Sequence, residues 1–269
     1  MLFVCPKCKG KLNIAEGGRA VCQSGHSFDR AKEGYYNLLL GASGGTHGDN
    51  AEMVAARRTF LERGFYGPLA DAMSDIVCGV LESSNASVLD AGCGEGYYTE
   101  RVARRVADRA RVAAFDISKD AVKRVAKRGF AGDFAVASAY KMPLLDGSVD
   151  AIYNVFSPFA PGECHRVLRS GGYFIAAIAA EEHLFELKEK IYDTPYKNVV
   201  ADKALSGFEL VDERELKYDI LLETREDVRS LFMMTPYAYR TSEEGRKRVN
   251  AIECLQTTAH FLILVYRKI

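Results

Sequence analysis

The sequence predicts an α/β protein, in which a doubly wound, mostly parallel sheet follows a small N-terminal domain. Apolar runs typical of buried strands alternate with helical segments from about residue 82 onward. One of these runs passes directly into alternate glycines and a helix start, which is how a βαβ unit opens a ligand cleft. Three cysteines and a histidine gather in the first 26 residues, which favours a separate metal-binding piece.

The N-terminal cluster has the spacing of a Cys3His zinc site, with Cys5, Cys8, Cys22 and His26 as ligands. Four ligands close a tetrahedral shell, so the metal would be structural, and its binding would supply most of the folding energy of so small a piece. A redox pair with an unrelated histidine is the alternative, although the βαβ context of a thioredoxin-like site is missing. The other four cysteines are isolated and receive no role.

Basic residues outnumber acidic residues around these ligands, which suits a nucleic-acid partner. They are Lys7, Lys9, Lys11, Arg19, Arg30 and Lys32. The glycine-rich stretch 41–48 then predicts a flexible joint. A helix follows, capped by Asp49 or Asn50, and a second helix covers 69–81. We therefore expect a zinc-binding RNA-recognition domain over 1–36, a linker with a helical extension over 37–81, and the main domain over 82–269.

The main domain opens with the stretch 88–99, where an apolar strand ends in Asp90 and runs into the glycine turn. A dinucleotide would place its pyrophosphate on this turn, where Asp90 and Glu95 would repel it. S-adenosylmethionine has no phosphate and carries a sulfonium and an ammonium, which two carboxylates attract. The alternative is an ordinary glycine turn with Asp90 as a helix cap. The candidate cofactor residues here are Asp90, Gly92, Gly94, Glu95, Gly96 and Tyr97.

A second acid supports this cofactor. Asp116 closes the next apolar run, where a carboxylate would bind both ribose hydroxyls. Ser138 and Ala139 follow the third strand, where adenine would lie. The remaining predicted elements are helices over 118–127, 163–168, 183–191 and 226–233 and strands over 134–137, 150–156, 173–178, 208–216 and 261–266.

The 269 residues carry no formal net charge, and 48% of them are hydrophobic. That is enough for one full domain and a small one. No run of eighteen apolar residues occurs, and the first residues lack a signal-peptide pattern, so we expect a cytoplasmic protein.

Four segments, in this order, resemble the RlmA family of large-subunit ribosomal RNA guanine-N1 methyltransferases. They are Cys-x2-Cys-x13-Cys-x3-His from Cys5, Ala-Lys-Glu-Gly-Tyr-x-Asn-Leu-Leu from Ala31, Gly-Asp-x2-Glu-Met-x2-Ala-Arg-Arg-x-Phe-Leu from Gly48, and Leu-Asp-x-Gly-Cys-Gly-Glu-Gly-Tyr-Tyr-Thr from Leu89. The similarity covers nearly the whole chain. It implies methyl transfer from S-adenosylmethionine to N1 of a guanine in a hairpin loop of 23S rRNA domain II, a zinc module that grips RNA, and a homodimer.

The resemblance also adds Tyr66 and His183 to the cofactor site. Their sequence surroundings match those of the family, except that Phe65 replaces a histidine. From the residues alone, Tyr66 would be a packed aromatic and His183 a surface or helix-cap histidine. The residues Asn154 to Pro158, at a predicted strand end, leave open which of two neighbouring guanines is modified. Their Asn-Val-Phe sequence is more similar to the Gram-positive, macrolide-resistance-related branch of the family.

Two other functions stay open. A small-molecule methyltransferase of the quinone type would use the same cofactor domain but leaves the zinc module unexplained. A non-catalytic, zinc-dependent RNA-binding protein would hold cofactor without turnover. The stacking candidates for a flipped base are Tyr97, Tyr98, Phe156 and Phe159, which can equally be core residues. No residue of the sequence identifies a catalytic base.

Overall fold

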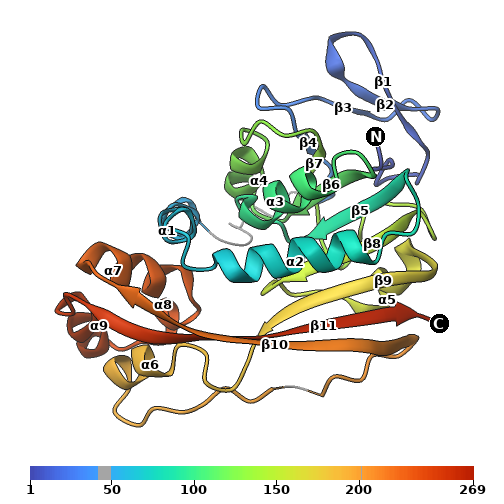
Figure 1. Cartoon of the computed structure of the whole chain (residues 1–269). Helices are drawn as coiled ribbons and strands as arrows, with labels where there is room; N and C mark the ends of the chain where they lie inside the picture. Colours follow the sequence, from blue (N-terminus) through green and yellow to red (C-terminus); the bar gives the residue numbers. More distant parts are fainter. Residues whose placement is uncertain (42–49, 201) are drawn as a thin grey trace.

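The computed structural model describes residues 1–41, 50–200 and 202–269 (Figure 1). Its main sheet has eight strands in the order β10-β11-β9-β8-β5-β6-β7-β4. The strands are β4 Tyr36–Asn37, β5 Ala86–Ala91, β6 Ala110–Asp116, β7 Asp133–Val136, β8 Val149–Val155, β9 Leu168–Ala179, β10 Phe208–Leu222 and β11 Leu255–Lys268. Strands β4 to β9 pair in parallel, and only β10 and β11 are antiparallel to their neighbours. The predicted doubly wound, mostly parallel sheet is confirmed.

Both faces of the sheet are buried at its central strands, because alternate residues of these strands enter separate cores. On one face, Val88 of β5 packs with the helices α2 Gly67–Gly79 and α3 Tyr97–Arg105. On the other face, Leu89 packs with α5 Pro161–Val167 and with side chains of the N-terminal module. The helix α4 Lys119–Val125 packs on β6 and β7.

The N-terminal module is joined to the main sheet by several backbone contacts. Its own sheet consists of β1 Leu12–Ile14, β2 Ala20–Cys22 and β3 Ser27–Phe28. The chain then adds β4 to the edge of the large sheet beside β7. The Val4 amide also donates to the Pro143 carbonyl at 2.8 Å, and the Leu2 amide donates to Asp133 Oδ2 at 2.7 Å. The module is therefore attached at both its ends.

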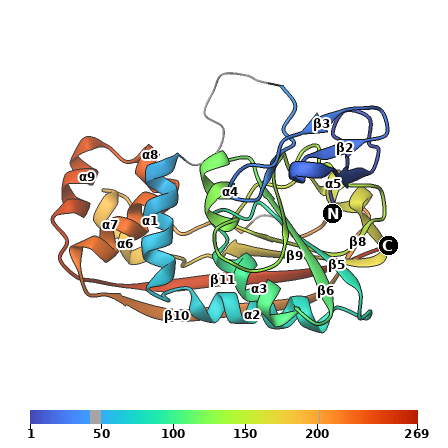
Figure 2. The same cartoon turned by 90° about the horizontal axis from the view of Figure 1, so that it is seen from above.

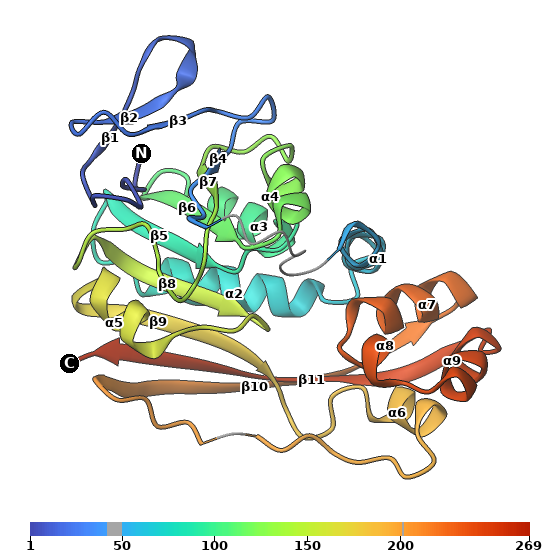
Figure 3. The ribbon, with the colours of Figure 1, turned by 180° about the vertical axis from the view of Figure 1, so that it is seen from behind.

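The strands β10 and β11 continue past the rest of the sheet and carry a group of helices (Figures 2 and 3). We call this group the helical lobe: α1 Ala51–Glu62, α6 Phe185–Ile191, α7 Arg225–Met234, α8 Tyr237–Arg240 and α9 Glu243–Asn250. As expected, Asn50 caps α1, since its side chain accepts the Met53 amide at 2.9 Å. The predicted joint over 41–48 lies, from residue 42 onward, outside the described residues. Among the described helices, none combines the length and apolar character that a membrane crossing needs.

Candidate cofactor cleft and metal centre

The glycine turn at the carboxyl end of β5 has a shape that only glycine adopts easily. Gly92, Gly94 and Gly96 have φ angles of +92°, +54° and +91°. A Cβ on Gly92 would lie 2.1 Å from Ser157 Oγ, and one on Gly96 would lie 2.4 Å from a methyl of Val125. The turn therefore packs closely against both the end of β8 and α4.

Asp90, at the end of β5, is buried with only 2% of its surface exposed. The Thr99 hydroxyl donates to its Oδ2 at 2.7 Å, which ties the strand to α3. Burial raises the pKa of Asp90 to about 7, while the hydrogen bond from Thr99 acts in the opposite direction. A cation bound nearby would favour the ionised form of this carboxyl.

Asp116 lies at the same edge of the sheet, because β5 and β6 are parallel neighbours. Its Oδ2 accepts the Gly94 amide at 2.9 Å, and its Oδ1 accepts the Ser118 amide at 2.8 Å. This carboxylate thus holds the glycine turn in place from the next strand. The structure brings Asp90, the three glycines and Asp116 together, as the sequence predicts.

Glu95 is also buried, but a guanidinium already balances its charge. It forms an ion pair with Arg128, which also contacts Glu100 at 2.7 Å and Glu62 at 2.8 Å. The electrostatic attraction for a cationic cofactor therefore depends mainly on Asp90 and Asp116. The second carboxylate oxygen of Glu95, Oε1, is buried and has no hydrogen-bond partner among the described residues.

Ser138 and Ala139 lie just after β7, at the same edge of the sheet. Ser138 lines a cavity of about 320 Å³, together with Ile117, the residue that follows Asp116. Of the two residues predicted to lie at the adenine, Ser138 thus borders a cavity, whereas Ala139 is not among its lining residues. Tyr97 opens α3 and is mostly buried, and its hydroxyl lacks a hydrogen-bond partner among the described residues.

Tyr66 and His183 lie together and pack against the ring of Phe156, the residue that follows β8. The Tyr66 hydroxyl is 3.3 Å from His183 Nε2, and the Phe156 ring stacks on His183 with centroids 6.2 Å apart. Burial lowers the pKa of His183 to about 3, so its imidazole is neutral at pH 7. Phe156 has a φ of +56°, and the residue is 43% exposed. Such a conformation is strained for a bulky residue and is typical of functional sites.

Two arginines near the turn were not predicted from the sequence. Arg128 comes from the segment after α4, 33 residues beyond Glu95, and no local spacing links the two. Arg57 of α1 donates to the Met234 carbonyl at 3.5 Å, and its guanidinium would lie 3.6 Å from a Cβ on Gly94. Arg57 thus spans from the helical lobe to the glycine turn. Only the fold brings these segments together.

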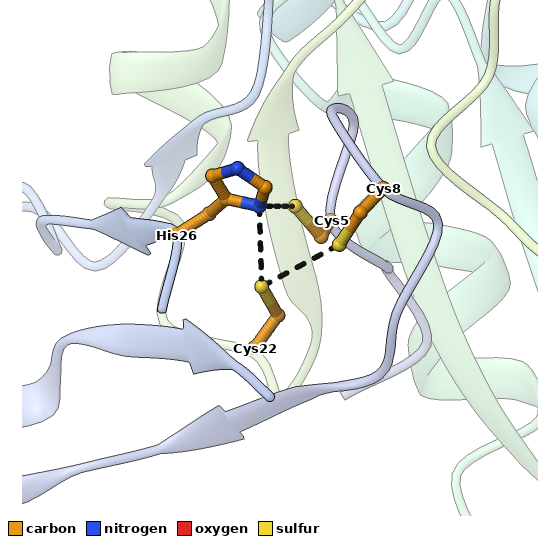
Figure 4. Close-up of side chains that lie close together, drawn as sticks. All are labelled: Cys5, Cys8, Cys22 and His26. Carbon is orange, nitrogen blue, oxygen red and sulfur yellow. Dashed lines mark hydrogen bonds between the residues drawn. The ribbon is translucent and has the colours of Figure 1, made fainter. Parts of the chain in front are cut away.

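The four predicted zinc ligands converge in the N-terminal module (Figure 4). The Sγ atoms of Cys5, Cys8 and Cys22 and Nδ1 of His26 all lie within 4.8 Å of one another. His26 Nδ1 is 3.4 Å from the Cys22 sulfur and 3.5 Å from the Cys5 sulfur. Ligands about 2.3 Å from one tetrahedral ion have similar separations. Hydrogen bonds lower the pKa of Cys8 to about 6; the larger effect comes from the Gly10 amide and the next from His26. The lowered pKa favours the thiolate that zinc needs.

The residues present fit both groups that the sequence implies. Three thiols and one imidazole are the donor set that zinc prefers. Beside the glycine turn, Asp90 and Asp116 lie at the carboxyl ends of adjacent parallel strands, and the buried Oε1 of Glu95 has no hydrogen-bond partner among the described residues. A cationic, phosphate-free cofactor matches the acidic edge.

The fold and the site define a class I S-adenosylmethionine-dependent methyltransferase with an N-terminal zinc-binding module. Residues 88–172 match the family model described as a methyltransferase domain, and residues 3–40 match the one described as RlmA, N-terminal. The chain is 34% identical to a protein of Micromonospora griseorubida named as a 23S rRNA (guanine-N1)-methyltransferase, over 98% of this chain and 97% of the relative. The chain belongs to this RlmA family.

Two other relatives differ in how much of the chain they share. The 23S rRNA (guanine(748)-N1)-methyltransferase of Streptomyces fradiae is 31% identical over 81% of this chain and 79% of the relative. The malonyl-[acyl-carrier protein] O-methyltransferase of Hamiltonella defensa is 30% identical over only 41% of this chain and 46% of the relative. The relative that is named for another substrate therefore matches less than half of this chain.

Proposed function

We propose that this protein transfers a methyl group from S-adenosylmethionine to N1 of a guanine in 23S rRNA. One observation carries the proposal: the acidic glycine cleft and the exposed, strained Phe156 ring lie at one sheet edge, in a chain whose N-terminal module gathers zinc ligands. The relatives named for this reaction extend over nearly the whole chain or four-fifths of it. The quinone-type alternative accounts for the cofactor domain alone.

The bound cofactor supplies an electrophilic methyl group on a cationic sulfur. Asp90 and Asp116 place negative charge at the edge where that cation binds, and the glycine turn lets the backbone approach it. Phe156 offers an exposed aromatic face on which an unpaired guanine can stack. The buried Tyr66 and His183 hold this ring from below and keep water out. These residues align and dehydrate the reactants, which is most of what a methyl transfer requires. We assign no catalytic base.

We further propose that the target guanine lies in a hairpin loop of domain II and that the basic face of the zinc module holds this RNA. The relative from Streptomyces fradiae is named for guanine 748, which favours that position over a neighbouring guanine. We also propose that the protein works in the cytoplasm as a homodimer, on the strength of the family resemblance. Light scattering of the purified protein tests the dimer.

The decisive experiment supplies labelled S-adenosylmethionine and compares total RNA from a strain lacking the gene with a quinone extract. We expect label in 23S rRNA, and an N1-methyl group at one guanine, where it blocks reverse transcription. Label confined to the extract would favour the small-molecule alternative. Cofactor and RNA binding without turnover would favour the non-catalytic alternative.

A Phe156→Ala variant tests the stacking role. We expect it to lose about five- to 150-fold in kcat/KM for RNA, since base–aromatic stacking contributes roughly 1–3 kcal/mol per base. A Phe156→Tyr variant keeps an aromatic face and should retain most of the activity. Equal losses in both variants would contradict stacking.

A further inference from the structure

The cavity of about 320 Å³ lies where the zinc module meets the main sheet. Its walls come from both parts of the protein. The module contributes Cys5, Pro6 and Lys9, and the sheet contributes Ile117 after β6 and Ser138 after β7. The chain that follows β4, from Leu38 to Gly41, closes a further side. One ligand in this cavity would touch the zinc module and the strand ends together.

The cavity lies beside the strand end that carries Asp116, because Ile117 is one of its lining residues. Ile117 directly follows Asp116, whose carboxylate accepts the Gly94 amide of the glycine turn. Parallel strands place their ligands outside their carboxyl ends, and β6 and β7 are adjacent parallel strands. A cofactor whose ribose lies at Asp116 would therefore extend its purine toward Ile117 and Ser138.

The lining suits a purine ring. Leu40 and Ile117 are apolar but 40% and 36% exposed, so they offer uncovered flat surface to an aromatic ring. Lys9 and Lys141 also line the cavity, and their ammonium groups can donate hydrogen bonds to ring nitrogens. The volume exceeds that of a water molecule about tenfold, which leaves room for a base.

The wall that the module contributes depends on the conformation of the turn from Cys5 to Lys9, which we call the metal-binding knuckle. Cys5 and Lys9 are joined by a hydrogen bond from the Lys9 amide to the Cys5 carbonyl at 2.8 Å. Lys9 has a φ of +60°, a conformation that costs a non-glycine residue energy unless its surroundings enforce it. The flanking ligands Cys5 and Cys8 supply that enforcement when they share an ion.

We propose that the zinc module forms the outer wall of the cofactor's purine subsite, so that metal loading raises the affinity for the cofactor. This inference rests on the proposed cofactor but not on the RNA substrate. The zinc then has two tasks, because the same knuckle that presents basic residues to RNA also completes the cofactor site.

A Cys22→Ala variant tests the coupling, because Cys22 is a zinc ligand that does not line the cavity. Calorimetry without RNA measures the binding of S-adenosylhomocysteine and of 5′-methylthioadenosine, which has the purine but no amino acid. We expect at least about tenfold weaker binding of both, or about 1.4 kcal/mol. Hydrogen exchange in β5 and β8 checks that the main sheet stays folded. Unchanged affinity in zinc-free protein, or an affinity loss accompanied by unfolding of β5 and β8, would overturn the proposal.

A matched pair of lysine variants tests the wall itself. Lys9 lines the cavity, whereas Lys7, in the same knuckle, does not. We expect Lys9→Ala to keep its zinc and bind 5′-methylthioadenosine about fivefold more weakly, as for one lost hydrogen bond. Lys7→Ala should bind it as the wild type does. If Lys9→Ala weakens RNA binding alone, the cavity serves RNA and the proposal fails. Both tests measure cofactor binding, so they discriminate equally well if the protein proves inactive on rRNA.

Discussion

The Tyr66 hydroxyl lies 3.3 Å from His183 Nε2, although the two residues are 117 positions apart in the chain. The backbone amide of His260 donates to the other ring nitrogen, Nδ1, at 3.2 Å. Since burial keeps the imidazole neutral, its proton must be on Nε2, which therefore donates to the Tyr66 oxygen. The contact fixes both the tautomer and the orientation of His183.

Removing this acceptor should destabilise the protein. In Tyr66→Phe, the buried His183 N–H loses its partner, which costs about 1–3 kcal/mol of unfolding free energy. Urea unfolding of the cofactor-free protein measures the loss. Tyr140→Phe is the control, because Tyr140 is 68% exposed and should change stability little. Equal stability of the two variants would rule out the hydrogen bond.

Asp90 should make the cofactor-free protein less stable as pH rises. Its pKa is about 7 in the folded protein and about 3.9 when unfolded. Between these values the folded state binds more protons, so this group's contribution to stability falls as pH rises from 4 to 7 and stays low above. Asp90→Asn removes the titration. Urea unfolding from pH 5 to 8 should show the variant gaining stability relative to the wild type with rising pH; a constant difference would contradict the buried carboxyl.

Arg128, which pairs with the buried Glu95, should contribute far more to stability than Arg104, an exposed arginine that pairs with Glu100. Arg128→Ala leaves the buried Glu95 carboxylate unpaired, a change that costs about 3–5 kcal/mol. Arg104→Ala removes an exposed contact to Glu100 and should cost at most about 1 kcal/mol. Urea unfolding compares the two. A second change, Glu95→Gln, should restore much of the loss in Arg128→Ala, and failure to do so would argue against the buried charge.

Gly92 should not tolerate a side chain. In Gly92→Ala, the new Cβ would clash with Ser157 and would need a positive φ, which together cost at least about 2 kcal/mol. S-adenosylhomocysteine binding should weaken as well. Gly79→Ala offers a control, since nothing lies within 4 Å of its Cβ position in α2, and it should stabilise the protein slightly. Normal thermal stability and normal cofactor binding in Gly92→Ala would contradict the packed turn.

Cys8→Ala should lose the metal, and Cys254→Ala should not. We expect one zinc ion per chain in the wild type by elemental analysis, and rapid proteolysis of the first 40 residues in Cys8→Ala. Methylation of 23S rRNA should fall at least about tenfold in the same variant. Cys254 is exposed and distant in sequence from the cluster. Full rRNA activity in Cys8→Ala would remove the metal from substrate recognition.

Local signals in the sequence predicted much of this structure. Because a capping bond spans only three residues, the sequence predicted Asp49 or Asn50 as the cap of α1, and Asn50 forms the bond. The zinc ligands and the glycine turn are likewise defined by short spacings, and the structure places them together. These features depend on neighbouring residues, so a single sequence reveals them.

Other features depend on contacts that no local pattern encodes. The helix α9 was not predicted, because most of its residues are charged or polar and only Gly245 and Val249 are buried. The predicted strand over 208–216 extends to Leu222, since its exposed edge carries charged residues that weaken a strand pattern. Glu95 was expected to attract the cofactor together with Asp90, but Arg128, from another segment, forms an ion pair with it.

The strand β4 adds a mechanical consequence. Because it is hydrogen-bonded into the sheet that forms the cofactor cleft, the metal cluster cannot swing freely relative to the cleft. Under the proposed function, the module and the cleft keep a constant separation, so the target nucleotide must lie at a matching distance from the RNA segment that the module holds.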